Sequence, residues 1–313
     1  VNNFNSDELE VILTKIDPKK KIPILLGSGF AENLSNIHNL NERQNFGNDL
    51  ETIKKIKTKN FFLELEKNKI LFPQVKEKKP SNGNWLIKSF RSYGGTKVHF
   101  LRKSQFLEEQ SYFQKFIKGE SVSVQFSVKN TKVNIIGVCD QFILKSKKKY
   151  FMGKALITKK ISHNFFIKIF DLTSQIAKIF SLEGLNSLDV ILKGEKIFLL
   201  EVNPRPGLSA KIIHFNNKNF LEKKTTLKHL NKKTFFSTVI IYANKEIKID
   251  QKKFMFLKKL SLSGEFSEIP NLGDIIGVDE PICLLHLKSK NIDFLEKTMI
   301  KKESQFLNKL AES

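Results

Sequence analysis

The stretch Leu199–Gly207 (LLEVNPRPG) decides the interpretation of this chain, because an apolar run ends in a carboxylate, a carboxamide and a guanidinium at every second residue. If the run is a buried β-strand, Glu201, Asn203 and Arg205 point to the same side of the sheet. A carboxylate and an amide oxygen suit Mg²⁺, which prefers hard oxygen ligands and shares them with nucleotide phosphates. Arg205 would lie beside that ion and hold a phosphate or carboxylate oxygen.

A second strand decides between this metal site and a simpler alternative, an ordinary surface turn with a polar tip. Ser187–Leu192 and Lys196–Val202 are predicted as strands joined by a tight turn at Lys193–Glu195. In that hairpin Asp189 lies close to opposite Glu201. Two carboxylates on neighbouring strands repel each other unless a cation joins them. The hairpin therefore predicts Mg²⁺ between the two carboxylates, with the amide of the strand end just beyond.

The loop Lys88–Gly95 (KSFRSYGG) has the side chains and glycines needed to cover a polyphosphate. Lys88 ends a predicted strand, so its ammonium can be held near a phosphate. Two glycines that allow close backbone approach and two further donors follow it: Gly94, Gly95, Arg91 and Ser92. The spacing G-x-x-x-x-G-K-[ST] is absent, so this is not a P-loop. Plain turn chemistry is the alternative for this loop taken alone.

A connector between two lobes is predicted at Gln114–Ile117, just before a turn centred on Gly119. Extended backbone here could pair with the edge of an adenine while Phe116, Ile117 or Leu199 packs on its face. The alternative is an amphipathic strand with one face in the core.

The positive charge raises nucleic acid as a partner, but its make-up argues against that class. The 313 residues carry a formal net charge of +22. The only arginines are Arg43, Arg91, Arg102 and Arg205, and the remaining positive charge is lysine spread along the chain. Reading bases or phosphates in a bidentate manner favours arginine. A basic nucleic-acid-binding protein is therefore kept only as the weakest alternative.

Nothing in the chain indicates export or membrane insertion. No run approaches the roughly 20 apolar residues of a membrane span, and the first 30 residues lack the order of a secretion signal. Cys139 and Cys283 lie in apolar runs, which favours buried thiols in a reducing cytoplasm. Val1 is not a usual initiator, so we expect further residues upstream.

The predicted elements divide the chain into a βα start, a central α+β region and a small C-terminal module. Helices are expected at 49–59, 61–68, 165–181 and 292–310, and strands at 22–29, 85–88, 97–101, 112–117, 121–128, 133–144, 187–192, 196–202, 235–243 and 281–287. The expected domains are 1–57, a partial α/β domain; 58–217, with a lid lobe 58–118 and a core lobe 119–217; a lysine-rich linker, 218–233; and a β-rich module, 234–313.

Taken in order, these segments resemble the ATP-grasp superfamily. The matching pieces are WLIKSFRSYGG, YFQKFIKGESVSV and LDVILKGEKIFLLEVNPRPG, over about Lys59–Ser209. The start (PILLGSGF, then FGN) and the tail (PICLLHL) resemble the branch related to biotin carboxylase and uncharacterised ATP-dependent carboligases. The resemblance implies an α+β fold in which two lobes grip ATP, with a partial N-terminal α/β domain and a small, mostly β C-terminal module.

The resemblance also implies a role for each matching residue. For the nucleotide, Lys88 would contact the α- and β-phosphates, Lys59 would be the earlier nucleotide-binding lysine, and Gln114 and Ile117 would offer backbone groups to the adenine. The metal ligands would be Asp189, Glu201 and Asn203, which would hold one or two Mg²⁺ ions, with Mn²⁺ as the substitute. Arg205 would contact the γ-phosphate or the acyl-phosphate. This chain departs from the family twice. Only Glu120 lies near the usual position of a ribose-binding acid, and Ser187 stands where several members have an arginine.

The function implied is an ADP-forming ligase that joins a small-molecule carboxylate to an amine through an acyl-phosphate. The excess of lysine hints at an anionic substrate. The alternative is a degenerate ATP-binding protein with a regulatory role. The acceptor pockets of such enzymes are assembled outside the motifs, so the sequence leaves both substrates and the oligomeric state open.

Overall fold

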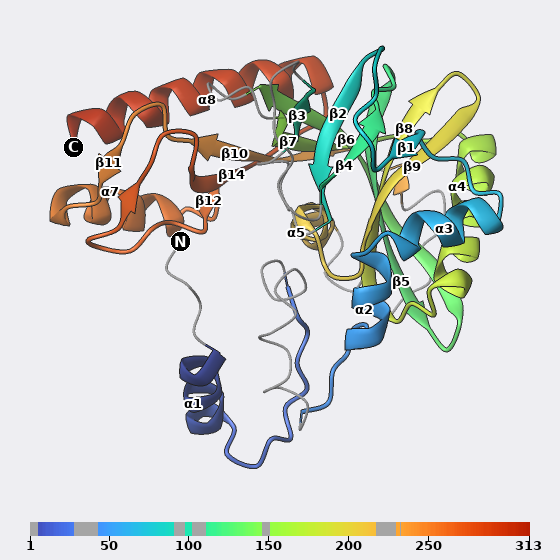
Figure 1. The fold of residues 1–313 in the computed structure, drawn as a ribbon. Helices are drawn as coiled ribbons and strands as arrows, with labels where there is room; N and C mark the ends of the chain where they lie inside the picture. The colour runs from blue at the N-terminus through green and yellow to red at the C-terminus, as the bar shows by residue number, and fades with distance from the viewer. Residues whose placement is uncertain are drawn as a thin grey trace. The chain divides into compact units, whose positions relative to one another are not determined.

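The computed structural model describes residues 6–27, 43–90, 98–101, 111–145, 151–216, 230–231 and 233–313. The chain forms two compact units. The first consists of Val1–Gly137 and Ser162–Gly207, and the second of Val138–Ile161 and Leu208–Ser313. Both units combine helices with strands, which confirms the predicted α+β class (Figure 1). The domain boundaries expected from the sequence remain predictions.

A small antiparallel sheet forms one lobe of the first unit, with strand order β1-β4-β2-β3. Its strands are β1 (Val75–Lys76), β2 (Trp85–Ser89), β3 (His99–Phe100) and β4 (Ser111–Lys115). The first unit also contains the helices α1 (Ser6–Ile16), α2 (Leu50–Ile56) and α3 (Asn60–Lys67). Trp85, Ile87 and Phe113 form its buried core. The helices expected at 49–59 and 61–68 are confirmed within a few residues of their expected bounds. The strands expected at 85–88, 97–101 and 112–117 are confirmed in the same way.

The N-terminal segment pairs less than the sequence predicts. Of the strand expected over Ile22–Gly29, the described residues show only a single parallel bridge between Ile24 and Asn45. Pro23 has no N–H to donate, which prevents a regular ladder on the N-terminal side of the bridge.

The second lobe of the first unit is built on long antiparallel strands in the order β9-β8-β5-β6. Its elements are β5 (Glu120–Lys129), β6 (Lys132–Lys145), α4 (His163–Ile179), β8 (Gly184–Lys193) and β9 (Lys196–Asn203). Helix α4 begins where Ser162 Oγ accepts a hydrogen bond from Phe165 N and buries Ile169 and Ile176, as its apolar spacing predicts. Strand β6, expected in two pieces, is one strand of 14 residues.

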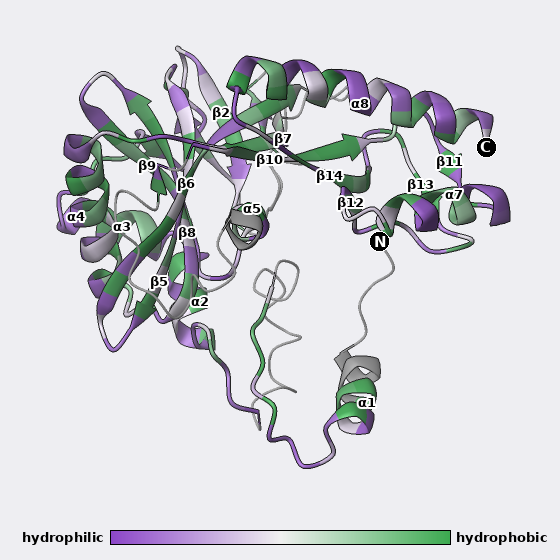
Figure 2. Ribbon diagram, turned by 180° about the vertical axis from the view of Figure 1, so that it is seen from behind, coloured by the Kyte–Doolittle hydropathy of each residue, from purple (hydrophilic) through white to green (hydrophobic). Residues whose placement is uncertain are grey.

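The second unit combines a sheet with helices that the sequence analysis predicted only in part. The strand order is β6-β7-β10-β14-β12. Its elements are β7 (Phe151–Thr158), α5 (Leu208–Asn216), β10 (Phe235–Tyr242), β11 (Ile247–Lys248), α7 (Gln251–Ser261), β12 (Phe266–Ser267), β13 (Ile275–Ile276), β14 (Pro281–Ser289) and α8 (Ile292–Glu312). Helix α8 lies along β10 and β14, whose ribbons are largely hydrophobic in Figure 2. Val239, Ile241, Leu285, Leu295 and Phe306 belong to the core between them.

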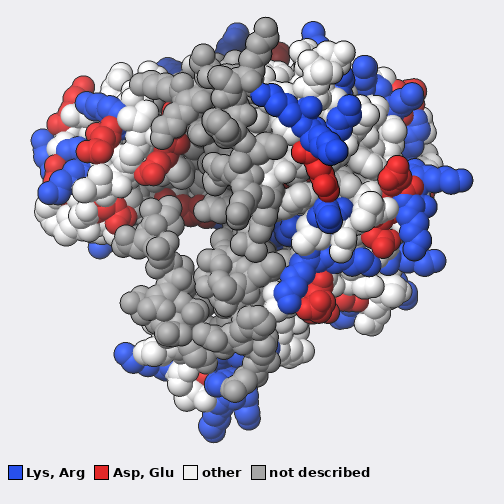
Figure 3. All heavy atoms as spheres, in the orientation of Figure 1, with Lys and Arg blue, Asp and Glu red and all other residues white. Residues whose placement is uncertain are grey.

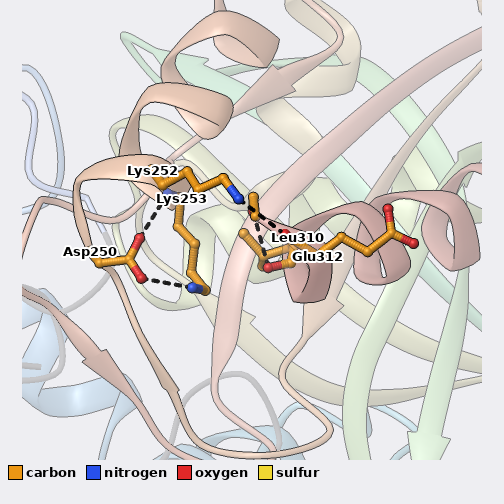
Figure 4. A network of polar contacts seen from close by, with 6 residues as sticks. Asp250, Lys252, Lys253, Leu310 and Glu312 are labelled. Carbon is orange, nitrogen blue, oxygen red and sulfur yellow. Dashed lines mark hydrogen bonds and ion pairs between the residues drawn. The ribbon is translucent and has the colours of Figure 1, made fainter.

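Helix α7 was not predicted from the sequence, because its many lysines obscure the N-terminal capping signal. Asp250 caps the helix by accepting from Lys253 N at 2.9 Å, and it forms an ion pair with Lys253 Nζ at 2.8 Å (Figure 4). Lys252 Nζ donates to the carbonyl oxygen of Glu312 at 3.4 Å, which links the start of α7 to the end of α8. A cap at Asp250 ahead of spaced apolar residues was the available signal.

Two further expectations concern cysteines and membranes. Cys139 and Cys283 are both buried free thiols, as predicted. In the described part of the chain, no helix combines the length and the apolar character that crossing a bilayer requires.

Gly119 brings the end of the connector against β8. A Cβ atom at Gly119 would lie 2.3 Å from the carbonyl oxygen of Leu192 and 2.6 Å from a methyl carbon of Ile191. Backbone cannot yield to such a contact as a flexible side chain can, so the approach requires glycine at this position.

We predict that Gly119→Ala destabilises the first unit by about 1–3 kcal/mol, because the added methyl group overpacks the connector against β8. The measurement is urea denaturation followed by the fluorescence of Trp85, the chain's one tryptophan, which lies in the same unit. Gly27→Ala is the matched control, since a Cβ there meets no atom within 4 Å. Equal stability of the two variants would contradict the prediction.

Candidate active site

A β-bulge in the β8–β9 hairpin brings two carboxylates face to face. From the turn, the ladder runs regularly to the pair Val190–Leu199, and the next pair is Asp189–Glu201, so that Leu200 is left without a partner. In an unbroken ladder Asp189 would face Leu200, and Glu201 would point to the other side of the sheet. The predicted pairing of Asp189 with Glu201 is confirmed, and the extra residue in β9 is what makes it possible.

The polar residues that follow Glu201 at every second position converge with it, as period-two geometry predicts. Asn203 Nδ2 donates to Asp189 Oδ2 and to Glu201 Oε1, both at 3.3 Å. Arg205 Nη2 in turn lies 3.4 Å from Asn203 Oδ1. Asn203 and Arg205 are buried, at 8% and 7% exposed, and Asp189 and Glu201 are partly buried. One carboxyl pair, one carboxamide and one guanidinium therefore share a single site.

The charges of the two carboxyl groups are shaped by burial and by each other. Burial and the neighbouring charge of Glu201 raise the pKa of Asp189 to about 8. Burial also disfavours the charged form of Glu201, but attraction to Lys88 and Lys57 outweighs it, so the pKa of Glu201 is lowered. Of the two carboxyl groups, Asp189 is therefore the one that more readily holds a proton.

A lysine of the small lobe faces this carboxyl pair. Lys88 ends strand β2, is 8% exposed, and donates to Gln114 Oε1 at 3.4 Å. Burial works against its charge, but Tyr112, Glu201 and Asp189 outweigh burial and raise the pKa of Lys88. Lys88 therefore stays a cation, stabilised by the negative charge of the carboxyl pair.

Strand β4 places two further side chains beside Lys88. Tyr112 pairs in register with Lys88 and Gln114 with Leu86, so Tyr112 and Gln114 lie on the same face of the small sheet as Lys88. Gln114 is 1% exposed, and no described residue forms a hydrogen bond with its Nε2. A buried donor without a partner costs free energy until a ligand accepts from it.

The donor set suits a hard divalent cation and an anionic ligand. Two opposed carboxylates and an amide supply oxygen ligands of the kind that Mg²⁺ prefers, with further positions left for phosphate oxygens. Asn203 presents its Nδ2 to the carboxylates here, and rotation of the amide by half a turn presents Oδ1 instead. The described residues contain no group of three or more His, Cys, Asp or Glu that could hold a metal. A zinc site of that type is thus absent from the described part, and the carboxyl pair relies on a ligand to complete its coordination.

The remaining predicted site residues lie in different settings. Lys59 lies at the start of α3 with an exposed side chain, 4.0 Å from Glu77 Oε1. Phe116 is exposed and its ring meets that of Phe100 edge-on, with 5.2 Å between centroids. Glu120 is exposed at the start of β5. Predicted loop residues Arg91, Ser92, Gly94 and Gly95 lie outside the described residues.

Near the connector, some backbone N–H groups have hydrogen-bond partners in the described residues and one does not. Leu199 is fully buried, and its N–H donates to the carbonyl oxygen of Leu71 at 2.9 Å. Phe116 N donates to the carbonyl oxygen of Asn84 at 2.9 Å. The N–H of Ile117, one residue further, has no partner within the described ranges. The backbone N–H of Ile117 is therefore available at the position where we predicted pairing with the edge of an adenine.

Sequence reasoning missed several residues that support the site. Tyr112 contacts Lys88, and Ser123, the register partner of Asp189 on β5, hydrogen-bonds to the Asp189 carboxyl group. Tyr112 could have been found by stepping back two residues from Gln114 along the strand. Ser123 depends on the pairing of β5 with β8, which no local pattern predicts.

The sequence profile of the ATP-grasp domain matches residues 54–209. Comparison with curated protein sequences gives no match. Three solved structures are similar in fold. L-Amino acid ligase from Bacillus licheniformis is 13% identical (TM-score 0.67; 99% of this chain and 84% of that chain covered). The biotin carboxylase domain of 2-oxoglutarate carboxylase from Hydrogenobacter thermophilus is 12% identical (TM-score 0.66; 91% of this chain and 74% of that chain covered). N5-carboxyaminoimidazole ribonucleotide synthetase from Thermotoga maritima is 12% identical (TM-score 0.62; 96% of this chain and 84% of that chain covered).

We predict that binding of Mg·ATP at pH 7 releases about one proton, because a cation between the carboxyl groups displaces the proton of Asp189. The release should fall toward zero as pH rises past about 8, where Asp189 is already ionised. Isothermal titration calorimetry in two buffers of different ionisation enthalpy measures it. Asp189→Asn, which has no such proton, is the reference. Equal proton release by both proteins would contradict the assignment.

Proposed function

Because this chain belongs to the ATP-grasp superfamily, we propose that it is an ATP- and Mg²⁺-dependent ligase that joins a small-molecule carboxylate to an amine. The observation that carries the proposal is the partly buried pair Asp189 and Glu201, whose charges act on the ammonium of Lys88. Such a pair is costly unless a cation occupies it. A divalent ion bearing nucleotide phosphates supplies that cation, and Lys88 supplies a counter-charge for the phosphates.

The reaction proceeds in two balanced steps. A carboxylate oxygen of the first substrate attacks the γ-phosphorus of ATP, and the bond between that phosphorus and the β–γ bridging oxygen breaks, which gives an acyl-phosphate and ADP. The amine then attacks the acyl carbon, a C–N bond forms, phosphate leaves, and the amine loses a proton to solvent. Such transfer depends on positioning and charge neutralisation. A site of lysine, arginine and carboxylates therefore suffices without a nucleophilic side chain.

The residues divide this work between them. Asp189, Glu201 and Asn203 hold the metal, and Lys88 holds the α- and β-phosphates. The bound Mg²⁺, or Mn²⁺ in its place, neutralises phosphate charge. Arg205 binds the oxygens of the γ-phosphate and of the acyl-phosphate. Ser187, buried opposite Asn203, offers no positive charge, so Arg205 carries this task alone.

The connector binds the adenine. The N–H of Ile117 donates to a ring nitrogen, the backbone of Gln114 meets the exocyclic edge, and the exposed ring of Phe116 covers a face of the adenine. The side chain of Gln114 offers its free Nε2 to the phosphates. Glu120 and Lys59 are assigned to ribose and nucleotide contacts. Loop residues Ser92, Gly94 and Gly95 are assigned to the phosphates.

Two other functions compete with this proposal. A degenerate, regulatory ATP-binding protein would bind Mg·ATP without turnover, and the complete donor set argues against it. A nucleic-acid-binding protein is motivated by the +22 charge. On the face shown in Figure 3, however, Lys and Arg side chains are interspersed with Asp and Glu and do not form one basic stripe. The buried free thiols Cys139 and Cys283 fit a reducing cytoplasm.

We predict that Glu201→Gln and Lys88→Ala each reduce ADP formation by about 10²–10³-fold or more, because each removes a charge that acts on the phosphates. The assay screens pairs of carboxylates and amines for ADP release, with mass detection of the product. Glu195→Gln is the matched control, since Glu195 pairs with Lys168 at the exposed turn of the same hairpin. Undiminished turnover in both site variants would overturn the proposal, and Mg·ATP binding without turnover for any pair would favour the regulatory alternative.

A further inference from the structure

Asn48 reaches from the N-terminal segment into the base of the site. Its side chain is 3% exposed. The Nδ2 atom donates to Asn186 Oδ1 at 2.7 Å and to the carbonyl oxygen of Pro204 at 2.9 Å. The Oδ1 atom accepts from the backbone N–H of Glu183 at 2.9 Å. One amide therefore ties the start of β8 to the residue that follows β9, across 135 to 156 positions of sequence.

The carbonyl of Pro204 has no ladder partner of its own. Strand β9 ends at Asn203, and Pro204 is buried. A buried carbonyl oxygen requires a donor, and Asn48 Nδ2 is that donor. This carbonyl belongs to the peptide that leads into Arg205. Holding it fixes the plane of that peptide and hence the direction in which the Arg205 side chain leaves the backbone.

The other contacts of Asn48 make this anchor rigid. Asn186 is fully buried, and its backbone oxygen accepts from Gln125 Nε2 at 2.7 Å. Gly184, with φ of +67°, leaves room for the segment before Asn48, since a Cβ there would lie 2.1 Å from the carbonyl oxygen of Phe46. Close packing and a chain of buried amides thus hold Asn48 in place.

We propose that Asn48 is a positioning residue for Arg205, acting through the carbonyl of Pro204. The segment 43–49, which the sequence analysis assigned to a preceding domain, thereby sets the geometry of the phosphate site. The placing of Arg205 by Asn48 does not depend on the proposed function, but its effect on nucleotide binding does. If Arg205 binds the γ-phosphate, loss of Asn48 weakens the binding of ATP more than that of ADP.

The first experiment reads the position of Arg205 without any nucleotide. The chain has four arginines, so protein labelled with ¹⁵N-arginine gives few side-chain Nε–H signals, and Arg205→Lys identifies the one from Arg205. Asn48→Ala and the milder Asn48→Ser should shift or broaden this signal. Asn45→Ala is the matched control, because within the described ranges the Asn45 side chain bonds to backbone of its own turn, that of Asn48 and Gly47, and to no atom of β8 or β9.

The second experiment measures the affinities of Mg·ATP and Mg·ADP by calorimetry in the same variants. Loss of Asn48 should reduce the preference for ATP over ADP about tenfold, whereas Asn45→Ala should leave it unchanged. An unshifted Arg205 signal in a folded Asn48 variant would overturn the inference, as would an unchanged preference in a protein that binds both nucleotides. If the wild-type protein binds neither nucleotide, the proposed function fails, and the first experiment still decides the role of Asn48.

Discussion

The structure of the site depends on one unfavourable contact, the burial of two carboxyl groups opposite each other on adjacent strands. A regular hairpin would have placed Asp189 and Glu201 on opposite faces of the sheet, and the bulge at Leu200 places them on the same face. Like charges in this position destabilise a sheet unless a proton or a cation intervenes. The other charged and polar groups of the site, Lys88 and Asn203 among them, lie where they reduce that repulsion.

The same constraint explains why the site is assembled from distant parts of one unit. Lys88 comes from the small sheet, the carboxyl pair from the long hairpin, and Asn48 from the N-terminal segment. Lys88 and Asn48 are buried, and Asp189 and Glu201 are partly buried. Buried polar groups must be satisfied, so their positions are fixed by the packing around them. Among the described residues, Gln114 Nε2 is a buried donor of the site without a hydrogen-bond partner, which points to a ligand and not to a defect of packing.

Local patterns in the sequence were sufficient for the hairpin and for the helices α2, α3, α4 and α8. The run LDVILKGEKIFLLEVN contains both strands and a short turn, so the facing of Asp189 and Glu201 could be anticipated within one residue. The bulge could not, because it depends on how the hairpin packs against neighbouring strands. Tyr112, Ser123 and Asn48 were missed for a related reason. Their roles arise from pairing between segments far apart in sequence, and no period in the chain encodes such pairing.

The role of the carboxyl pair is tested most directly by a crystal structure of the protein with Mn²⁺ and ADP, with the metal located by its anomalous scattering. We expect a Mn²⁺ ion bound by oxygen atoms of both Asp189 and Glu201 and by nucleotide phosphate, with Lys88 in contact with the phosphates. Metal bound elsewhere, or nucleotide bound while the carboxyl pair keeps its proton and holds no cation, would contradict that role.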